Sequence, residues 1–194
     1  MLDQPGRRRS SERADAARNR RRILSAAMAI VAERGVGALS MDAVAAAAGV
    51  GVGTVYRRFT DLSGLVYALV DEQERRFQDA FLRGPAPLGP GAPPAVRIRA
   101  FLRALADRTE DQAELLLTAE SATPMARVES GAYTAYHQHL AMLIGELRPG
   151  LDAHYLADAL LAPLAAELFV HQRRTMSLER IKDGLDTLLA GIVS

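Results

Sequence analysis

The residues best suited to chemistry lie in one short run, GVGVGTVYRRF at positions 49–59. The run holds the hydroxyl groups of Thr54 and Tyr56, two adjacent arginines and three glycines, and it holds no acidic residue. Hydroxyl and guanidinium groups bind phosphate oxygens and base edges, and glycines let a backbone come close to a partner. The run therefore favours contact with a nucleic acid, against the alternative of an exposed cationic turn in an ordinary helical domain.

Two short helices are predicted to hold this run in place. Ser40 suits the N-cap of the first helix, because its hydroxyl can accept a backbone N–H that the first turn leaves free. Gly49 suits the end of that helix, since glycine takes the left-handed conformation readily. The second helix is expected at Gly53–Phe59, before Thr60 and Asp61 open a third. Two helices joined in this way form the helix-turn-helix pattern, whose second helix enters the major groove of DNA.

The positions of this motif predict distinct roles. Tyr56 is expected to contact a phosphate or a base edge, and Val52 to touch a thymine methyl group. The other polar side chains would bind phosphates, whereas Val55 and Phe59 are expected in the core. The predicted DNA-binding residues are Ser40, Val52, Gly53, Thr54, Tyr56, Arg57 and Arg58.

The run from Gly49 to Phe59, followed by Leu65, closely resembles the DNA-binding signature of TetR/AcrR-type transcriptional regulators. Ile23, Ala27 and Gly35 are similar to the first helix of that family, so the resemblance covers about residues 18–70. It implies a homodimer, usually a repressor, that binds double-stranded DNA at a pseudo-palindromic operator. It also implies a C-terminal cavity in which an unknown small-molecule effector binds and thereby controls the DNA affinity.

Two positions depart from the family pattern. Leu62 stands where family members usually carry a phosphate-binding lysine, and the pair Gly51-Val52 replaces a commoner polar pair. Leu62 therefore leaves one backbone contact of the family without its usual lysine, and because of the Gly51-Val52 pair the base contacts of relatives are not carried over to this chain.

The composition predicts an all-α fold. Aromatic residues make up only 5% of the 194 residues, there is no tryptophan, and alanine and leucine dominate. The absence of cysteine excludes disulfides and thiolate metal sites, and no run approaches the roughly 20 apolar residues of a membrane span. We therefore expect a cytoplasmic protein without a membrane partner.

The net charge of +1 hides two oppositely charged parts. Residues 1–60 hold 11 basic and 5 acidic residues, a balance of +6, whereas residues 61–194 hold 13 and 18, a balance of −5. Positive charge beside the helix-turn-helix suits a module that binds a polyanion.

We predict a DNA-binding domain at 1–62 and a larger helical effector-binding and dimerisation domain at 63–194, with about nine helices in all. Residues 1–13 are expected to be a flexible basic arm, which either reaches DNA through Arg7–Arg9 or is simply solvated.

The apolar spacing predicts helices along most of the chain. Outside the helix-turn-helix they are expected at about 15–34, 61–82, 96–108, 112–121, 125–148 and 152–174, with a last helix after Ser177. In the segment 125–148, polar residues share an otherwise apolar face, as in an oriented ligand site, although ordinary core packing gives the same pattern. Pro163 is expected to kink the next helix. The predicted ligand-binding residues are Glu129, Tyr133, Tyr136, His137 and Phe169.

The last two helices are predicted to form a dimer interface. The helix at 152–174 is apolar nearly all round, and the last helix carries a narrow apolar seam, so together they exceed what one subunit can cover. Four helices from two chains would bury this surface. The predicted interface residues are Leu160, Leu164, Phe169, Ile181, Leu185, Leu188 and Ile192.

The sequence gives no support for catalysis, a metal or a cofactor. His137 and His139 lie about 200° apart on a helix, so they cannot chelate one ion together. The other histidines are scattered, and no nucleophile–base pair stands at an interpretable spacing. Two other classes of protein stay open, namely an architectural DNA binder without an effector and an all-α enzyme.

Overall fold

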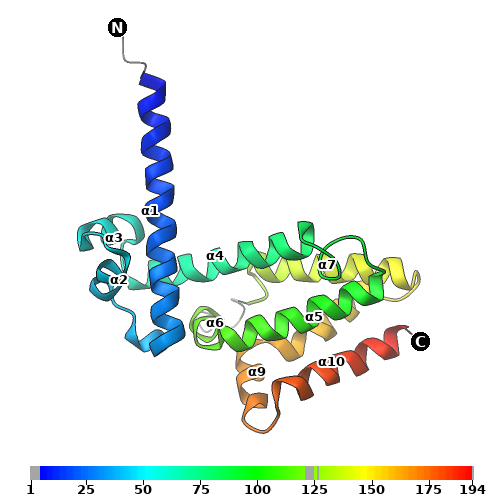
Figure 1. The fold of residues 1–194 in the computed structure, drawn as a ribbon. Helices are drawn as coiled ribbons and strands as arrows, with labels where there is room; N and C mark the ends of the chain where they lie inside the picture. The colour runs from blue at the N-terminus through cyan, green and yellow to red at the C-terminus, as the bar shows by residue number, and fades with distance from the viewer. Residues whose placement is uncertain (1–4, 121–124, 126, 194) are drawn as a thin grey trace. The chain divides into compact units, whose positions relative to one another are not determined.

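The computed structural model describes residues 5–120, 125 and 127–193. Within these ranges the chain forms ten α-helices, two short 3₁₀ segments and no β-strand (Figure 1), so the predicted all-α fold is confirmed. The helices are α1 (Pro5–Arg34), α2 (Met41–Ala48), α3 (Val52–Phe59), α4 (Leu62–Arg83), α5 (Pro94–Asp111), α6 (Ala113–Glu120), α7 (Gly131–Leu147), α8 (Ala153–Leu161), α9 (Ala166–Arg173) and α10 (Leu178–Val193), and the 3₁₀ segments are Val36–Ala38 and Ala162–Leu164.

Contacts between residues divide the chain into two compact units, Met1–Glu72 and Gln73–Ser194. We call them the N-terminal unit and the C-terminal unit. The division falls inside α4, so this helix contributes its first half to one unit and its second half to the other.

The N-terminal unit is built on small side chains that let its helices pack closely. α2 packs on α1, and α3 packs on α2. Ala27 of α1, Val44 of α2 and Val55 of α3 are completely buried. Because alanine and valine are short, the helix axes can approach closely, and this sets the position of α3.

The predicted start and end of α2 are confirmed. The Ser40 Oγ accepts a hydrogen bond from the backbone N–H of Ala43 at 3.1 Å. Gly49 ends the helix in the left-handed region, with φ 62° and ψ 41°. A side chain at this position would be strained, so glycine is what allows the sharp turn into α3.

A tight turn also joins α3 to α4. The Asp61 Oδ1 accepts a hydrogen bond from the backbone N–H of Gly64 at 2.8 Å, which caps the start of α4. A Cβ atom at Gly64 would lie 2.2 Å from the carbonyl oxygen of Phe59, far inside van der Waals contact. The turn therefore requires glycine at position 64, and it holds the end of α3 against the start of α4.

Gly64→Ala is expected to lower the free energy of unfolding by about 1–3 kcal/mol, because the new methyl group must displace the Phe59 carbonyl. Gly53→Ala is the matched control, since a Cβ at Gly53 would meet no atom within 4 Å. The control should leave stability unchanged or raise it by up to about 1 kcal/mol, because alanine favours a helix more than glycine does. Urea unfolding followed by circular dichroism measures both, and equal stability of the two variants would contradict the role of Gly64.

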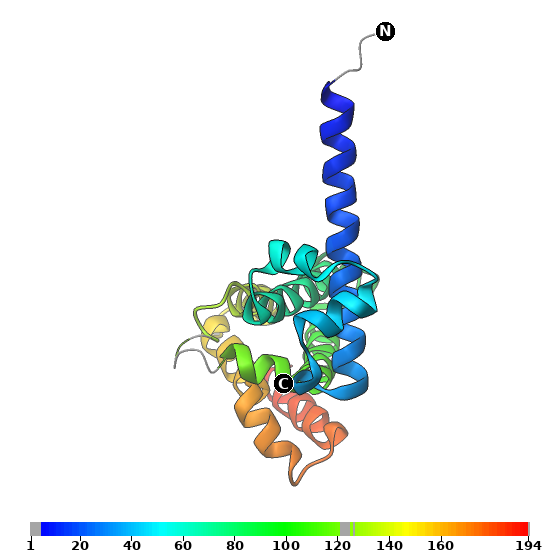
Figure 2. The same cartoon turned by 90° about the vertical axis from the view of Figure 1, so that its left-hand side faces the viewer.

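The C-terminal unit is organised around an aromatic cluster. α5 packs against α7 and α10, and α7 packs along α8 (Figure 1). α9 packs against α6, and the chain then turns back into α10 (Figure 2). The rings of Phe77, Phe81, Phe101 and Tyr136 lie with their centroids 5.1 to 6.1 Å from one another, mostly edge to face. This geometry is the one that aromatic rings prefer in a core.

Two predicted helices of the C-terminal unit have the wrong bounds. The helix expected at 125–148 begins only at Gly131, because the Ser130 Oγ caps it by accepting a hydrogen bond from the Tyr133 N–H at 3.1 Å. The helix expected at 152–174 is two helices, α8 and α9. Pro163 has no N–H to donate, and a 3₁₀ turn replaces the helix there, so the two parts are bent by 50° rather than kinked within one helix. Within the described ranges no single helix is long and apolar enough to cross a membrane, and only this bent pair reaches that length and composition together.

The first helix is longer than predicted. α1 begins at Pro5 rather than near residue 15, so residues 5–13, expected as part of a flexible arm, are helical. Residues 1–4 of that arm lie outside the described part of the chain. Proline is favoured at the first helical position, and arginine, glutamate and alanine form helices well. The prediction relied on apolar spacing, which indicates packing rather than helicity.

Candidate functional site

α3 turns most of the predicted contact residues outwards. Val52 and Tyr56 are 39% and 50% exposed, whereas Val55 is completely buried and Phe59 nearly so, as predicted. The spacing explains this division, because residues 55 and 59 lie one turn apart on the inner face. The exposed residues of α3 are Val52, Gly53, Tyr56, Arg57 and Arg58.

The three other predicted contacts have different surroundings. The Ser40 hydroxyl accepts the cap bond from Ala43, and its O–H is still a donor. Thr54 is half-buried beside the turn. The Arg58 Nη2 donates to the carbonyl oxygen of Ala16 in α1 at 2.6 Å. Arg58 is therefore held in place by α1, and this bond distinguishes it from its exposed neighbour Arg57.

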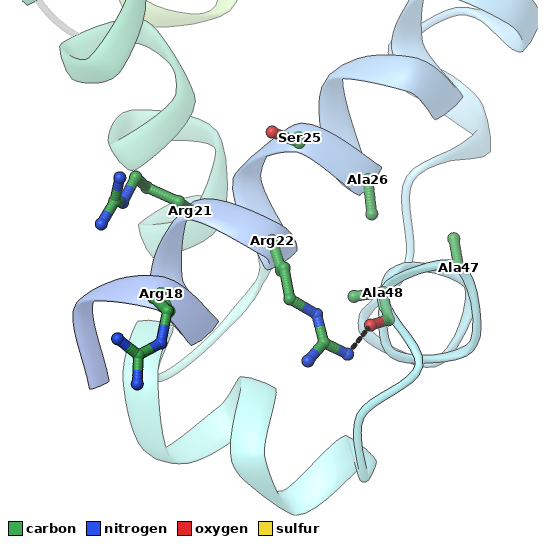
Figure 3. A pocket seen from close by; sticks show the side chains of 7 residues that line it. All are labelled: Arg18, Arg21, Arg22, Ser25, Ala26, Ala47 and Ala48. Atoms are coloured by element: carbon green, nitrogen blue, oxygen red, sulfur yellow. Dashed lines mark hydrogen bonds between the residues drawn. The ribbon is translucent and has the colours of Figure 1, made fainter. Parts of the chain in front are cut away.

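Arg22 makes a structural contact that sequence reasoning missed. Its Nη2 donates to the carbonyl oxygen of Ala48 at 2.6 Å (Figure 3). The same nitrogen donates to the carbonyl oxygen of Gly49 at 3.2 Å. These carbonyls end α2, where a cation is favoured by the helix dipole. Arg22 thus ties α1 to the turn that precedes α3, and no local pattern in the sequence links residues 26 positions apart.

The five predicted ligand residues do not form one site. Glu129 is exposed and precedes α7, and Phe169 is completely buried in the core. The Tyr133 hydroxyl donates to Asp158 Oδ1 at 2.6 Å, and His137 Nε2 lies 3.5 Å from the same oxygen. Burial, and then the bond to Asp158, raises the pKa of Tyr133 to about 12.

Tyr136 belongs to a separate, buried polar network. Its hydroxyl donates to Glu74 Oε2, and Gln78 Nε2 donates to Glu74 Oε1 at 2.8 Å. Arg108 Nη2 lies 3.1 Å from Glu74 Oε2, and both side chains are at most 10% exposed. The Arg108 guanidinium also lies over the Phe77 ring, 5.8 Å from its centroid. Burial raises the pKa of Tyr136, so its hydroxyl is a donor and not an anion at neutral pH.

The sequence did not single out Glu74 and Arg108. Glu74 lies three and seven residues before Phe77 and Phe81 and therefore on their side of α4. A carboxylate on an apolar helix face needs a partner, which is the signal that would have revealed the pair.

His139 is buried among aromatic rings, whereas His137 lies beside Asp158. It is 4% exposed, and its ring lies 4.5 Å from Phe81 and 5.1 Å from Phe101, between centroids. Burial, and then the charge of Arg97, lowers the pKa of His139 to about 4, so the ring is neutral at pH 7. Neither ring nitrogen has a hydrogen-bond partner among the described residues. No group of three or more His, Cys, Asp or Glu residues in that part of the chain has a metal-binding arrangement.

Six of the seven predicted interface residues are part of the subunit's own core. The buried six are Leu160, Leu164, Phe169, Ile181, Leu185 and Ile192, none more than 8% exposed. Leu188 differs, because 52% of its surface is exposed. Helical spacing indicated that these apolar residues lie on buried faces of their helices. It did not reveal that α5, α7 and α8 cover them within one chain.

Comparison with known proteins agrees with the helix-turn-helix arrangement of the N-terminal unit. Residues 23–69 match the family model of the bacterial regulatory proteins of the tetR family. Over 58 residues the chain is 43% identical to an HTH-type transcriptional regulator from Staphylococcus aureus strain USA300, covering 30% of this chain and 31% of that protein. The chain thus matches less than a third of the length of this curated relative.

Two solved structures share the fold over most of the chain. A TetR-like transcriptional regulator from Rhodococcus sp. RHA1 has a TM-score of 0.61 at 21% identity, covering 88% of this chain and 93% of that one. The transcriptional regulator FadR from Bacillus subtilis in complex with stearoyl-CoA has a TM-score of 0.63 at 17% identity, covering 89% and 97%. At these identities the likeness shows the fold alone. Residues 23–69 are thus similar to the tetR family of bacterial regulatory proteins, and the chain as a whole shares the fold of a solved TetR-like regulator.

Proposed function

We propose that the protein is a sequence-specific, DNA-binding transcriptional regulator that works in the cytoplasm. The observation that carries this proposal is the exposed face of α3, held by the buried residues Val55 and Phe59 and by two tight turns. A short helix presented in this way fits the major groove, which is about 12 Å wide. The family match over residues 23–69 supports the same role.

The side chains of α3 suggest how the groove would be read. Val52 offers methyl groups to a thymine methyl, and Tyr56 offers a hydroxyl to a base edge or a phosphate. Gly53 leaves space at the start of α3, because no atom of the chain lies within 4 Å of the position of a Cβ. Leu62, at the start of α4, offers no cation, so phosphate binding would fall to arginines elsewhere.

Selection of bound fragments from genomic DNA with the purified full-length protein tests this proposal. We expect enrichment of one short sequence upstream of particular genes. An architectural DNA binder would instead retain fragments without sequence preference, and an enzyme on this scaffold would retain none.

We also propose a homodimer in which α10 faces its counterpart. Leu188 is 52% exposed, and Gly184 and Gly191 lie on the same face of α10 with open space around each Cβ position. Small residues beside an exposed leucine let two helices approach closely. A two-fold dimer would present two copies of α3 to a pseudo-palindromic operator.

Leu188→Asp is expected to convert the dimer into a folded monomer, since a charge would be buried at the interface. Leu82→Asp, at another exposed leucine (49%), is the matched control and should remain dimeric. Sedimentation at micromolar concentration measures both. A dimer that survives Leu188→Asp unchanged would contradict this interface.

We further propose that a small-molecule effector binds the C-terminal unit and releases the operator, which makes the protein a repressor. Buried polar atoms without partners among the described residues, Arg108 Nε and Gln112 Oε1, support a polar ligand beside the aromatic cluster. Both residues lie at the C-terminal end of α5, four positions apart and therefore on one face.

A true effector is expected to weaken operator binding by about 5- to 150-fold, the usual size of such coupling. Stearoyl-CoA, bound by a protein of the same fold, is the first compound to test, followed by a metabolite panel. Gln112→Leu should reduce the response while leaving DNA affinity without effector unchanged. Operator affinity that no compound alters would refute this regulatory role, while leaving DNA binding intact.

A further inference from the structure

A hollow on the N-terminal unit collects arginine side chains from one side of α1. Its volume is about 580 Å³. Arg21 and Arg22 lie three and four residues after Arg18, so each of them is a neighbour of Arg18 on the helix surface. Ser25 adds a hydroxyl group, small alanine side chains complete the wall, and no lining residue is acidic (Figure 3). The lining residues are Arg18, Arg21, Arg22, Ser25, Ala26, Ala47 and Ala48.

One guanidinium group of the hollow is fixed in place. Arg22 bonds through Nη2 to the carbonyl oxygens of Ala48 and Gly49. These two bonds use a single nitrogen, so Arg22 keeps further N–H donors for a ligand. An arginine held in this way loses little freedom when an anion binds.

The positive charge of the hollow is only partly compensated. Arg18 forms an ion pair with Asp15, in which both side chains are more than half exposed. Arg21 makes no hydrogen bond or ion pair with any residue that the structure describes. Like charges at this spacing destabilise a helix, so the cluster is unfavourable in the free protein. An anion in the hollow would relieve this repulsion.

Two hydrogen bonds join the part of α1 that lines the hollow to the last turn of α3 and to the turn that precedes it. Arg58, in the last turn of α3, donates to the carbonyl oxygen of Ala16, and Arg22 reaches Gly49 just before α3. The part of α1 between Ala16 and Arg22 therefore runs alongside α3. This part of α1 carries Arg18 and Arg21. When a helix lies in the major groove, the two phosphate rows of the duplex run beside it.

We propose that the hollow binds a phosphate group, supplied by the backbone of the DNA that α3 contacts. Guanidinium groups suit phosphate because their parallel N–H groups match two of its oxygens. Such a contact would add affinity and fix the orientation of the protein without reading any base. The source of the phosphate rests on the proposed DNA-binding function, whereas the anion chemistry does not.

The test compares the salt dependence of DNA binding for Arg21→Gln and Arg34→Gln. Arg34 is exposed on the same helix but does not line the hollow, so its variant removes the same charge elsewhere. Arg21→Gln is expected to reduce the slope of log affinity against log salt by about 0.9, for specific and for random duplexes alike. Arg34→Gln should leave the slope unchanged. Arg22 is not substituted, because it also holds α2.

A second measurement does not require DNA. Inorganic phosphate is titrated into the wild-type protein while the arginine Nε–H resonances are followed by NMR. We expect saturable shifts that disappear in Arg21→Gln. Shifts without a change in the salt slope would support the phosphate site and overturn DNA as its source.

Two results separate this proposal from the proposed function. Equal salt slopes for Arg21→Gln and Arg34→Gln, together with no effect of phosphate on the resonances, would overturn the hollow as a phosphate site. A wild-type protein that binds all duplexes equally would overturn sequence-specific regulation, yet its slopes on random DNA would still test the hollow.

Discussion

Tyr56→Ala is expected to weaken specific DNA binding by about 5- to 150-fold, since losing one good contact at such an interface costs about 1–3 kcal/mol. The Tyr56 side chain is half exposed on α3 and is not part of the core. Its removal should therefore change the free energy of unfolding by less than about 0.5 kcal/mol. Fluorescence anisotropy with a selected operator measures the affinity, and circular dichroism confirms the fold.

Tyr67→Ala is the matched control for this prediction. Tyr67 is 54% exposed in the N-terminal unit, but it lies on α4 rather than on α3. The control should bind the operator as the wild type does. If both variants bound equally well, α3 would not be the element that contacts DNA.

Glu74→Gln is expected to lower the free energy of unfolding by about 3–5 kcal/mol, because Arg108 would be left as a buried charge without its partner. Arg108→Met should cost a similar amount, since Glu74 would then be the uncompensated charge. In the double variant neither charge remains, and the introduced glutamine can still accept a hydrogen bond from the Tyr136 hydroxyl. The double variant should therefore be clearly more stable than the sum of the two single effects predicts.

Urea unfolding of the four proteins gives this coupling as a double-mutant cycle. Arg83 and Asp79 offer a control pair at 3.0 Å in the same helix, with side chains 80% and 67% exposed. Because exposed pairs contribute less than about 1 kcal/mol, the cycle for this pair should be nearly additive. An additive cycle for Glu74 and Arg108 as well would show that their contact contributes nothing beyond burial.

The sequence predicted those features that depend on neighbouring residues. Ser40, Gly49 and the pattern of Val55 and Phe59 indicated the cap, the turn and the buried side of α3, because each depends on residues within one helical turn. The same reasoning located the break at Pro163, although it underestimated how completely a proline with a 3₁₀ turn separates two helices.

Contacts between distant residues could not be predicted in this way. Arg58 meets Ala16, and Glu74 meets Arg108, only because the helices cross at those points. Apolar spacing has a similar limit, because it marks a face as buried without naming what covers it. For this reason Leu185 was predicted at an interface with a second chain, whereas it packs in the core of its own.

The most direct test of the central claim, that α3 lies in the major groove with Val52 against a base, removes methyl groups from each partner in turn. Each thymine of a selected operator is replaced in turn by uracil, which lacks only that methyl group. We predict that one replacement per half-site weakens wild-type binding about fourfold, as expected for about 0.8 kcal/mol per methyl contact, and has little effect on Val52→Ala. Uracil replacements that never affect binding, or that affect both proteins equally, would contradict this docking of α3.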